Sequence, residues 1–227
     1  MNKFLLFSTI IICVVYGYDD LELPPFPPRN HAKVARNVVH KSNWASIGSI
    51  SSDPRLKGFP MVTLISIADS AVGAPSTGHI YFMLTDQDFT GKDWNIHNNV
   101  TLLLSNDEDL TCTKRGMDTM EPTCSRVIIA GNVIKLKPSD ADYAFAKYNF
   151  FSRHPAGKKW IHVHNFYLAE FNISTIFVVD WYGGPHQVTR DDYFKSTTYS
   201  ENEINGLEYE DKEIKHSYFG INVILKD

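Results

Sequence analysis

Short runs rich in β-branched and aromatic residues recur along most of this chain, with turn residues between them. Such runs are typical of β-strands. We expect strands over residues 44–51, 61–68, 80–84, 100–105, 127–137, 166–172 and 174–179. Because these runs follow one another at short intervals, with few helical stretches between them, they favour a closed or nearly closed antiparallel barrel. The chain is therefore predicted to have a β-rich α+β fold.

Two segments have a helical pattern instead. Asn30 is a suitable N-cap, and an apolar stripe follows it between residues 34 and 39. A second helix is expected to begin at Ser139, which has capping-box spacing with Asp142, and to end before residues 152–155. The barrel is therefore expected to have a few short helices around it.

The first 17 residues have the layout of a signal peptide. Lys3 precedes an apolar run from Phe4 to Val15, and the small residue Gly17 follows. A membrane anchor is the alternative, but Asp19 and Asp20 follow too early for the roughly 20 apolar residues that a spanning helix needs. We expect cleavage near Gly17 and export by the secretory pathway, without a transmembrane anchor.

The remainder of the 227-residue chain is long enough for one sizeable domain. We expect a proline-rich extended arm over residues 18–30, the barrel domain over residues 31–199, and an acidic, poorly ordered tail over residues 200–227. The 22 Lys and Arg residues against 26 Asp and Glu residues give a net charge of −4. This mildly acidic balance argues against nucleic acids and anionic membranes as partners.

Cysteine usage fits an exported protein. Cys13 lies in the predicted signal peptide, which leaves Cys112 and Cys124. An even pair in an exported chain is expected to form a disulfide, here closing a loop that contains Gly116 and Pro122. A metal pair or a catalytic thiol is the alternative, but no partner histidines lie nearby in the sequence.

Two acceptor sequences for N-glycosylation occur in the chain. Asn99 begins Asn-Val-Thr and Asn172 begins Asn-Ile-Ser, both without proline in the middle position. The pattern is common by chance, and the signal peptide gives it weight because glycosylation takes place in the secretory lumen. We expect both asparagines to carry glycans.

Other motifs are incomplete. Residues 73–78 have the glycine spacing of a phosphate-binding loop, but His79 and Ile80 stand where lysine and a hydroxyl residue are needed, so we expect a turn. Residues 86–97 begin like a calcium-binding loop but end in histidine instead of glutamate, so we expect a solvated loop. The starting points of esterase chemistry and dinucleotide binding, Gly-x-Ser-x-Gly and Gly-x-Gly-x-x-Gly, are absent.

His162 and His164 are the strongest candidates for metal ligands, since they are alternate residues of an expected extended segment and alternate residues of a strand point to one face. A third ligand is not evident, and histidines beside aromatic residues more often form hydrogen bonds at a surface. The adjacent Asp191 and Asp192 point apart and are expected to be solvated. The sequence therefore predicts no catalytic residue and no metal site.

Several ordered motifs nevertheless resemble one family of secreted glycoproteins. They comprise residues 32–40 leading into 44–51, Phe-Ser-Arg-His-Pro at 151–155 with Trp160 and His164, Asn-Ile-Ser at 172–174, Asp-Trp-Tyr-Gly-Gly-Pro at 180–185 with Tyr193, and the cysteine loop with Gly116, Asp118 and Pro122. Together they span about residues 31–195 and resemble the CREG family.

This resemblance implies a split β-barrel of the FMN-binding type with a few short peripheral helices, as in pyridoxamine 5′-phosphate oxidases. It also implies a homodimer and a secreted or endolysosomal location. In flavin-using relatives the cofactor lies at the dimer interface, whereas CREG proteins resemble members whose corresponding pocket is filled by protein. The chain departs from the family in its longer region at residues 91–97 and in its acidic tail.

Two hypotheses of function follow. In the first, the chain is a non-enzymatic glycoprotein that binds other proteins, such as a receptor, in growth or differentiation control or in a lysosomal role. In the second, it is an FMN-dependent oxidoreductase of the pyridoxamine-phosphate-oxidase-like class. Such an enzyme must neutralise the FMN phosphate, for which Ser49, Ser51 and Arg126 are the candidates, although each also suits a strand surface. Because no catalytic constellation is present, we prefer the first hypothesis.

Arg153 and His154 are the polar pair of most interest in the family motif. With Pro155, Trp160 and His164, they are candidates to line the relict pocket or an interface. The alternative is structural, because the Arg-His-Pro sequence also suits the end of a helix, where His154 would favour the negative end of the helix dipole.

Overall fold

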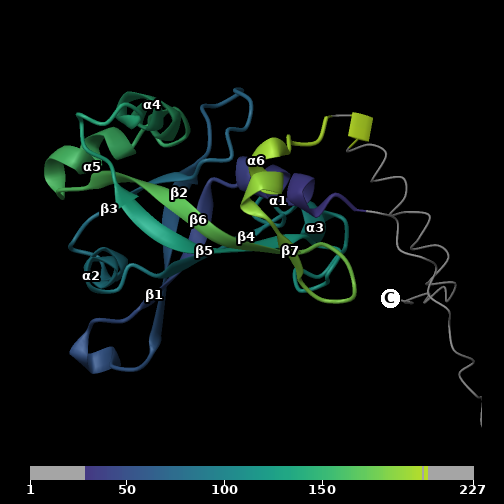
Figure 1. Ribbon diagram of the computed structural model, residues 1–227, viewed down its shortest axis with the longest axis horizontal. Coiled ribbons are helices and arrows are strands. Elements are labelled where there is room, and N and C mark those ends of the chain that lie inside the picture. Colours follow the sequence, from purple (N-terminus) through teal and green to yellow (C-terminus); the bar gives the residue numbers. More distant parts are fainter. Residues whose placement is uncertain (1–28, 201, 204–227) are drawn as a thin grey trace, which may run out of the picture.

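A computed structural model describes residues 29–200 and 202–203 (Figure 1). The predicted signal peptide, nearly all of the proline-rich arm and nearly all of the acidic tail lie outside the described residues. The described part consists of one rolled antiparallel sheet with helices packed around it.

The sheet has the strand order β3-β2-β1-β4-β5-β6-β7 within the described residues. A further pairing of β3 with β6, in which Tyr81 lies opposite Glu170, closes the first six strands of this order into a barrel. The strands are β1 (Trp44–Ile50), β2 (Pro60–Ala68), β3 (Tyr81–Leu84), β4 (Val100–Ser105), β5 (Arg126–Lys135), β6 (Tyr167–Val179) and β7 (His186–Val188). The predicted antiparallel barrel is confirmed.

The barrel interior is filled by alternate residues of its strands. In β4, Val100, Leu102 and Leu104 are buried, whereas Thr101 and Leu103 point outward. This period of two is what a sheet with one buried face requires. The interior also contains Ile47, Ile67, Phe82, Val127, Ile129, Phe171, Ile176 and Val178, all at most 2% exposed.

Helix α1 (His31–Lys41) supplies one side of this core. Asn30 caps it by accepting a hydrogen bond from the Lys33 backbone at 3.0 Å, as predicted, and its apolar stripe packs into the barrel cluster. The other helical elements are η1 (Pro54–Leu56), α2 (Phe89–Ile96), α3 (Thr111–Lys114), α4 (Tyr143–Arg153), α5 (Gly157–Val163) and α6 (Arg190–Lys195). No helix of the described residues is long and apolar enough to cross a membrane.

Helices α4 and α5 pack on the outside of the barrel, where Phe150 and Ala146 meet Tyr81 and Leu168 in a second apolar cluster. The second predicted helix is therefore present, but it begins at Tyr143 instead of Ser139 and ends at Arg153. Its N-cap position, Asp142, makes no side-chain capping hydrogen bond.

The separate strands predicted before and after Ile173 are wrong, because β6 is continuous over thirteen residues. The register shifts between Ala130 and Gly131 of β5, and Ser174 of β6 is left without a partner there. This extra residue forms a β-bulge, and the strand pairing continues on both sides of it. In the sequence, such a bulge resembles a break between two strands.

Two further local predictions are wrong. His162 lies in helix α5 and not on a strand, so the argument that His162 and His164 share a strand face does not apply. The predicted solvated loop at 86–97 contains helix α2, whose Gly91 packs so closely that an added Cβ would lie 2.0 Å from the Thr85 carbonyl oxygen. The segment 73–78 has neither helix nor strand, and the turn lies at its start, where the Ala74 backbone donates to the Ala71 carbonyl; both glycines have positive φ.

Candidate functional site

Arg153, the last residue of α4, reaches a buried carboxylate that no sequence pattern connects with it. Its guanidinium donates to Asp69 Oδ1 at 3.0 Å, to the Ser70 carbonyl at 2.7 Å and to the His40 carbonyl at 2.8 Å. The Asp69 side chain is fully buried and that of Arg153 is only 8% exposed. Arg153 therefore joins the end of α4 to the end of α1 and the end of β2.

His40 completes this cluster from the last turn of α1. Its Nδ1 lies 2.9 Å from Asp69 Oδ1. Burial alone would raise the pKa of Asp69, but hydrogen bonding from His40 and the charge of Arg153 outweigh burial and hold that pKa below its ordinary value. The carboxylate thus stays charged, with its lone pairs used inside the fold.

His154 also turns inward. Its Nε2 donates to the Ile67 carbonyl at 2.8 Å, and its ring packs 4.8 Å from that of Phe150. Burial lowers the pKa of His154, which favours the neutral imidazole. Arg153 and His154 are both held by backbone groups near the end of β2, so the structural reading of this pair is the one that the geometry supports.

The rest of the family motif does not converge with this pair on one pocket. Pro155 is exposed in the turn between α4 and α5. The Trp160 ring packs against Phe166 with 5.5 Å between centroids. His164 is exposed, and its carbonyl accepts a hydrogen bond from Thr85. These residues fix the path of α5 into β6.

The three candidates for an FMN phosphate do not fit that group. Ser49 is 5% exposed and donates to the buried Asp93 carboxylate at 2.7 Å. Burial alone would raise the pKa of Asp93, but hydrogen bonds from Ser52 and Ser49 lower it, so a negative charge already occupies the position. Ser51 bonds within its own turn, to the Asp53 backbone.

Arg126 lies elsewhere on the barrel. It pairs with Ser105, whereas Gly48, next to Ser49, pairs with Thr101, four residues away along β4. At ~3.3 Å per residue the two candidates are roughly 13 Å or more apart along the sheet. The Arg126 guanidinium donates instead to the Met120 carbonyl at 3.0 Å, in the cysteine loop.

The predicted disulfide is present between Cys112 and Cys124, with 5.8 Å between their Cα atoms. Asp107 lies beside it and accepts hydrogen bonds from the backbone and hydroxyl of Thr113, which anchor the loop to the barrel. Since the two sulfurs are bonded to each other, the alternatives of a thiolate metal site and a catalytic thiol do not apply here.

The two glycosylation candidates lie almost side by side. Asn172 of β6 pairs with Asn132 of β5, and the Asn132 amide donates to Asn99 Oδ1 at 3.3 Å. Asn99 is exposed, Asn172 is half-buried, and Ser174 is exposed at the bulge. Both acceptor asparagines therefore lie on one side of the barrel, although they are far apart in the sequence.

Sequence reasoning missed an exposed apolar surface on the outside of the barrel, here called the outer face. It consists of outward residues of β2, β1 and β4: Trp44, Ile50, Val62, Leu64 and Leu103, which are 43–65% exposed. Cross-strand pairing places Ser46 between Leu64 and Leu103, and Gly48 between Val62 and Thr101. In the sequence, residues 61–68 have apolar side chains on both faces of the expected strand, whereas a strand with one buried face has them on that face alone. This pattern indicates an exposed apolar surface.

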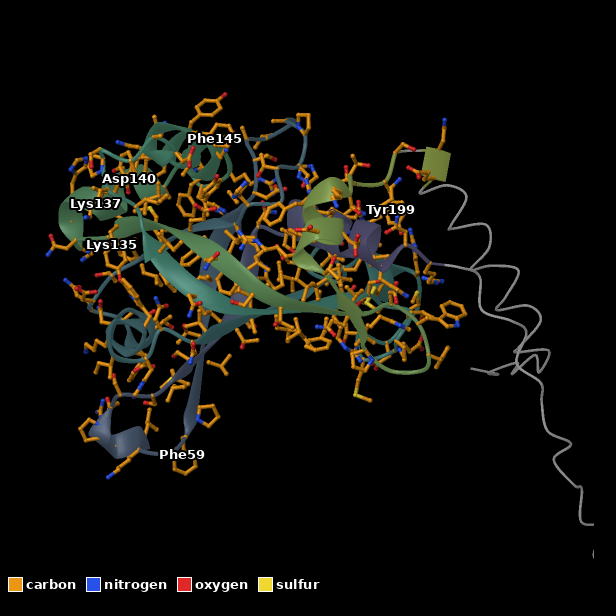
Figure 2. All side chains as sticks on the ribbon, in the orientation of Figure 1. Phe59, Lys135, Lys137, Asp140, Phe145 and Tyr199 are labelled. Atoms are coloured by element: carbon orange, nitrogen blue, oxygen red, sulfur yellow. A yellow bond between two sulfur atoms is a disulfide. The ribbon has the colours of Figure 1, made fainter. Side chains whose placement is uncertain are left out.

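At one end of the outer face, the β1–β2 connection projects from the barrel, with Phe59 near its tip (Figure 2). The Phe59 side chain is 66% exposed. Contiguous exposed apolar side chains of this kind are typical of surfaces that bind protein.

Comparison with known proteins supports this description. Residues 26–195 match the family described as CREG, beta-barrel. The chain belongs to the CREG family. Among curated CREG proteins, it is 36% identical over 179 residues to CREG1 of Mus musculus, covering 78% of this chain and 80% of the relative. Human CREG1 is 35% identical over 176 residues, covering 77% and 79%. Mouse CREG2 is 31% identical over 169 residues, covering 74% and 58%.

Solved structures agree on the fold. A heme binding protein from Mycobacterium smegmatis has a TM-score of 0.57 at 15% identity, covering 77% of this chain and 63% of that one. Campylobacter jejuni ChuZ has a TM-score of 0.53 at 12% identity, covering 74% and 61%. This CREG chain thus has the split-barrel fold that the resemblance implied.

Proposed function

We propose that this CREG-family chain is an exported glycoprotein that forms a homodimer and acts by binding other proteins, in growth or differentiation control or in the endolysosomal route, and not by catalysis. The observation that carries this proposal is the outer face. Val62 and Leu64 are 63% and 65% exposed there, next to Leu103 and Ile50. A second copy of the chain that covered this face would remove these side chains from water. Their burial would stabilise the dimer by roughly 25 cal/mol per Å² of apolar surface buried.

The polar groups of the family motif support a non-catalytic role. Arg153 and His40 direct side-chain nitrogens at the Asp69 carboxylate, and Arg153 also donates to backbone carbonyls. A catalytic acid, base or nucleophile must instead reach a substrate. These residues therefore act on the stability of the fold, which leaves binding as the function that the surface supports.

The buried Asp93 argues against FMN at the candidate residues. A phosphate beside Ser49 would meet a carboxylate that is 1% exposed and already accepts hydrogen bonds from Ser49 and Ser52. The negative charges of the phosphate and of the Asp93 carboxylate would repel each other, which disfavours binding. The disulfide and the two acceptor asparagines are in turn compatible with export.

The dimer is tested by light scattering after gel filtration of the mature chain, produced through a secretory pathway. Leu64→Lys places a charge in the centre of the outer face, and we expect it to convert dimer to monomer. Val72→Lys is the control, because Val72 is 72% exposed in the β2–β3 connection, outside the outer face. A monomeric wild type, or a Leu64→Lys variant that remains dimeric, would contradict the proposal.

The expectation that the chain does not retain FMN is tested on the same preparation. We expect no flavin absorbance to stay with the protein through gel filtration after saturation with FMN. Retained FMN, together with turnover that a substitution in the binding site abolishes, would establish the oxidoreductase alternative in place of the binding role.

A further inference from the structure

His31, Asp180 and His186 come together from three parts of the chain. His31 is the first residue of α1, Asp180 directly follows β6, and His186 is the first residue of β7. Figure 1 shows α1 and β7 on the same side of the molecule, near α6. The sequence separates His31 from His186 by most of the barrel, and the packing of α1 against β7 makes them neighbours.

The donor atoms of the three side chains form a compact group. Nδ1 of His31 lies 2.8 Å and 3.1 Å from the two oxygens of Asp180. The rings of His31 and His186 are stacked, with 3.9 Å between centroids and 8° between planes. One ligand atom from each of the three residues lies within 4.8 Å of the other two.

The local backbone explains why His186 returns to this place. Gly183 and Gly184 have φ of 105° and 101°, a region that side chains disfavour and glycine tolerates. The chain therefore reverses between Asp180 and His186. Arg29 supports the turn by donating to the Asp180 carbonyl at 3.1 Å and by lying 4.2 Å from the Trp181 ring.

Two imidazoles and one carboxylate are a ligand set for divalent transition-metal ions, zinc above all, with an open position for water. The Asp180 side chain is fully buried, while the His31 side chain is 29% exposed and leaves a route from solvent. Tetrahedral zinc, with bonds of about 2.0–2.2 Å, needs ligand atoms roughly 3.4 Å apart. Because a metal ion lies in the plane of each imidazole that binds it, the stacked rings do not have this arrangement, and binding requires the His186 ring to turn out of the stack.

We propose that His31, Asp180 and His186 bind one divalent transition-metal ion. The bound ion ties the start of α1 to the turn after β6 and to β7. The site is independent of the outer face and of the proposed dimer.

The test is zinc titration of the full mature chain, made without a polyhistidine tag and stripped with chelator, followed by isothermal calorimetry. His186→Phe keeps a stacking ring and removes the ligand. Loss of residues that merely orient metal ligands costs roughly 10–100-fold in affinity, so loss of a ligand is expected to cost at least about 100-fold. His162→Phe is the control, because His162 lies exposed on α5, away from the cluster.

Two measurements accompany the titration. The melting temperatures of wild type and His186→Phe in chelator must agree, which shows that the variant folds. Cobalt in place of zinc should give the visible absorption of a low-coordinate nitrogen and oxygen site, lost in His186→Phe and kept in His162→Phe. Equal zinc affinity of wild type and His186→Phe, or no zinc binding by the wild type, would overturn the proposal.

Discussion

Arg153 shows how one side chain can hold three elements together. Its guanidinium bonds to groups from the ends of α1 and β2, around the fully buried Asp69. Removing one partner of such a pair leaves a buried charge without compensation, which typically costs about 3–5 kcal/mol. We therefore expect Arg153→Met to lower the free energy of unfolding by about that amount, as measured by urea denaturation.

The matched control for Arg153 is Arg55→Met. Arg55 also forms an ion pair, with Asp53, but its side chain is 79% exposed. Exposed pairs of this kind contribute little to stability. If both substitutions had the same small effect, the Asp69 cluster would not be the tertiary link described above.

His154 gives the fold a dependence on pH. Burial lowers its pKa in the folded state below the ordinary value of 6.5. As the pH falls through 6.5, the unfolded chain takes up a proton that the folded chain does not yet bind, so this residue makes stability decrease toward acid. We expect His154→Gln, which keeps a donor toward Ile67, to show a flatter fall of melting temperature between pH 7 and pH 5.

The control for this pH profile is His162→Gln, an exposed histidine of α5. It should leave the wild-type profile unchanged. A His154→Gln profile parallel to the wild type would mean that other groups carry the pH dependence.

At the scale of elements, α1 depends on its cap. Asn30 accepts from the Lys33 backbone, and the helix supplies an apolar side to the barrel core. Loss of an N-cap costs roughly 0.5–2 kcal/mol. We expect Asn30→Ala to lower stability within this range in thermal unfolding.

Asp142→Ala is the counterpart on α4. Asp142 stands at the N-cap position but makes no capping hydrogen bond with its side chain. Its substitution should therefore change the melting temperature less than Asn30→Ala does. A larger change in melting temperature for Asp142→Ala than for Asn30→Ala would show that the charge of a cap residue stabilises the helix more than its capping hydrogen bond does.

Elements were predictable where local pattern and tertiary environment agree. The β4 run alternates between buried and exposed residues, and its bounds match the prediction. The α2 helix was missed because its residues have no apolar stripe. Its place depends on contacts from other elements, Gly91 against Thr85 and Asp93 against Ser49.

At the scale of the whole molecule, both acceptor asparagines share one side of the barrel with Asn132 between them. We expect Asn99→Gln and Asn172→Gln each to remove one glycan from the secreted chain, and the double variant to be insensitive to peptide N-glycosidase. The measurement is electrophoretic mobility before and after the enzyme. An unchanged mobility of either single variant would show that its asparagine is not glycosylated.

The proposed glycan at Asn99 bears on where the proposed dimer interface lies. Asn99 lies just before β4, two residues from the outward-pointing Thr101, and so borders the outer face. A glycan there leaves the side around Val62 and Leu64 as the accessible centre of an interface. This is the physical reason for choosing Leu64 to test the dimer.

The sequence by itself determined the barrel class, the capped helix α1, the cysteine pair and the family, because strand periodicity, capping residues and ordered motifs are local properties of the chain. Only the tertiary structure decided what the polar residues do. Arg153 meets Asp69 across more than eighty residues, and His31 meets Asp180 across about one hundred and fifty. Pairings of that range depend on strand register and barrel closure, which bring the ends of distant elements together and which no local pattern encodes.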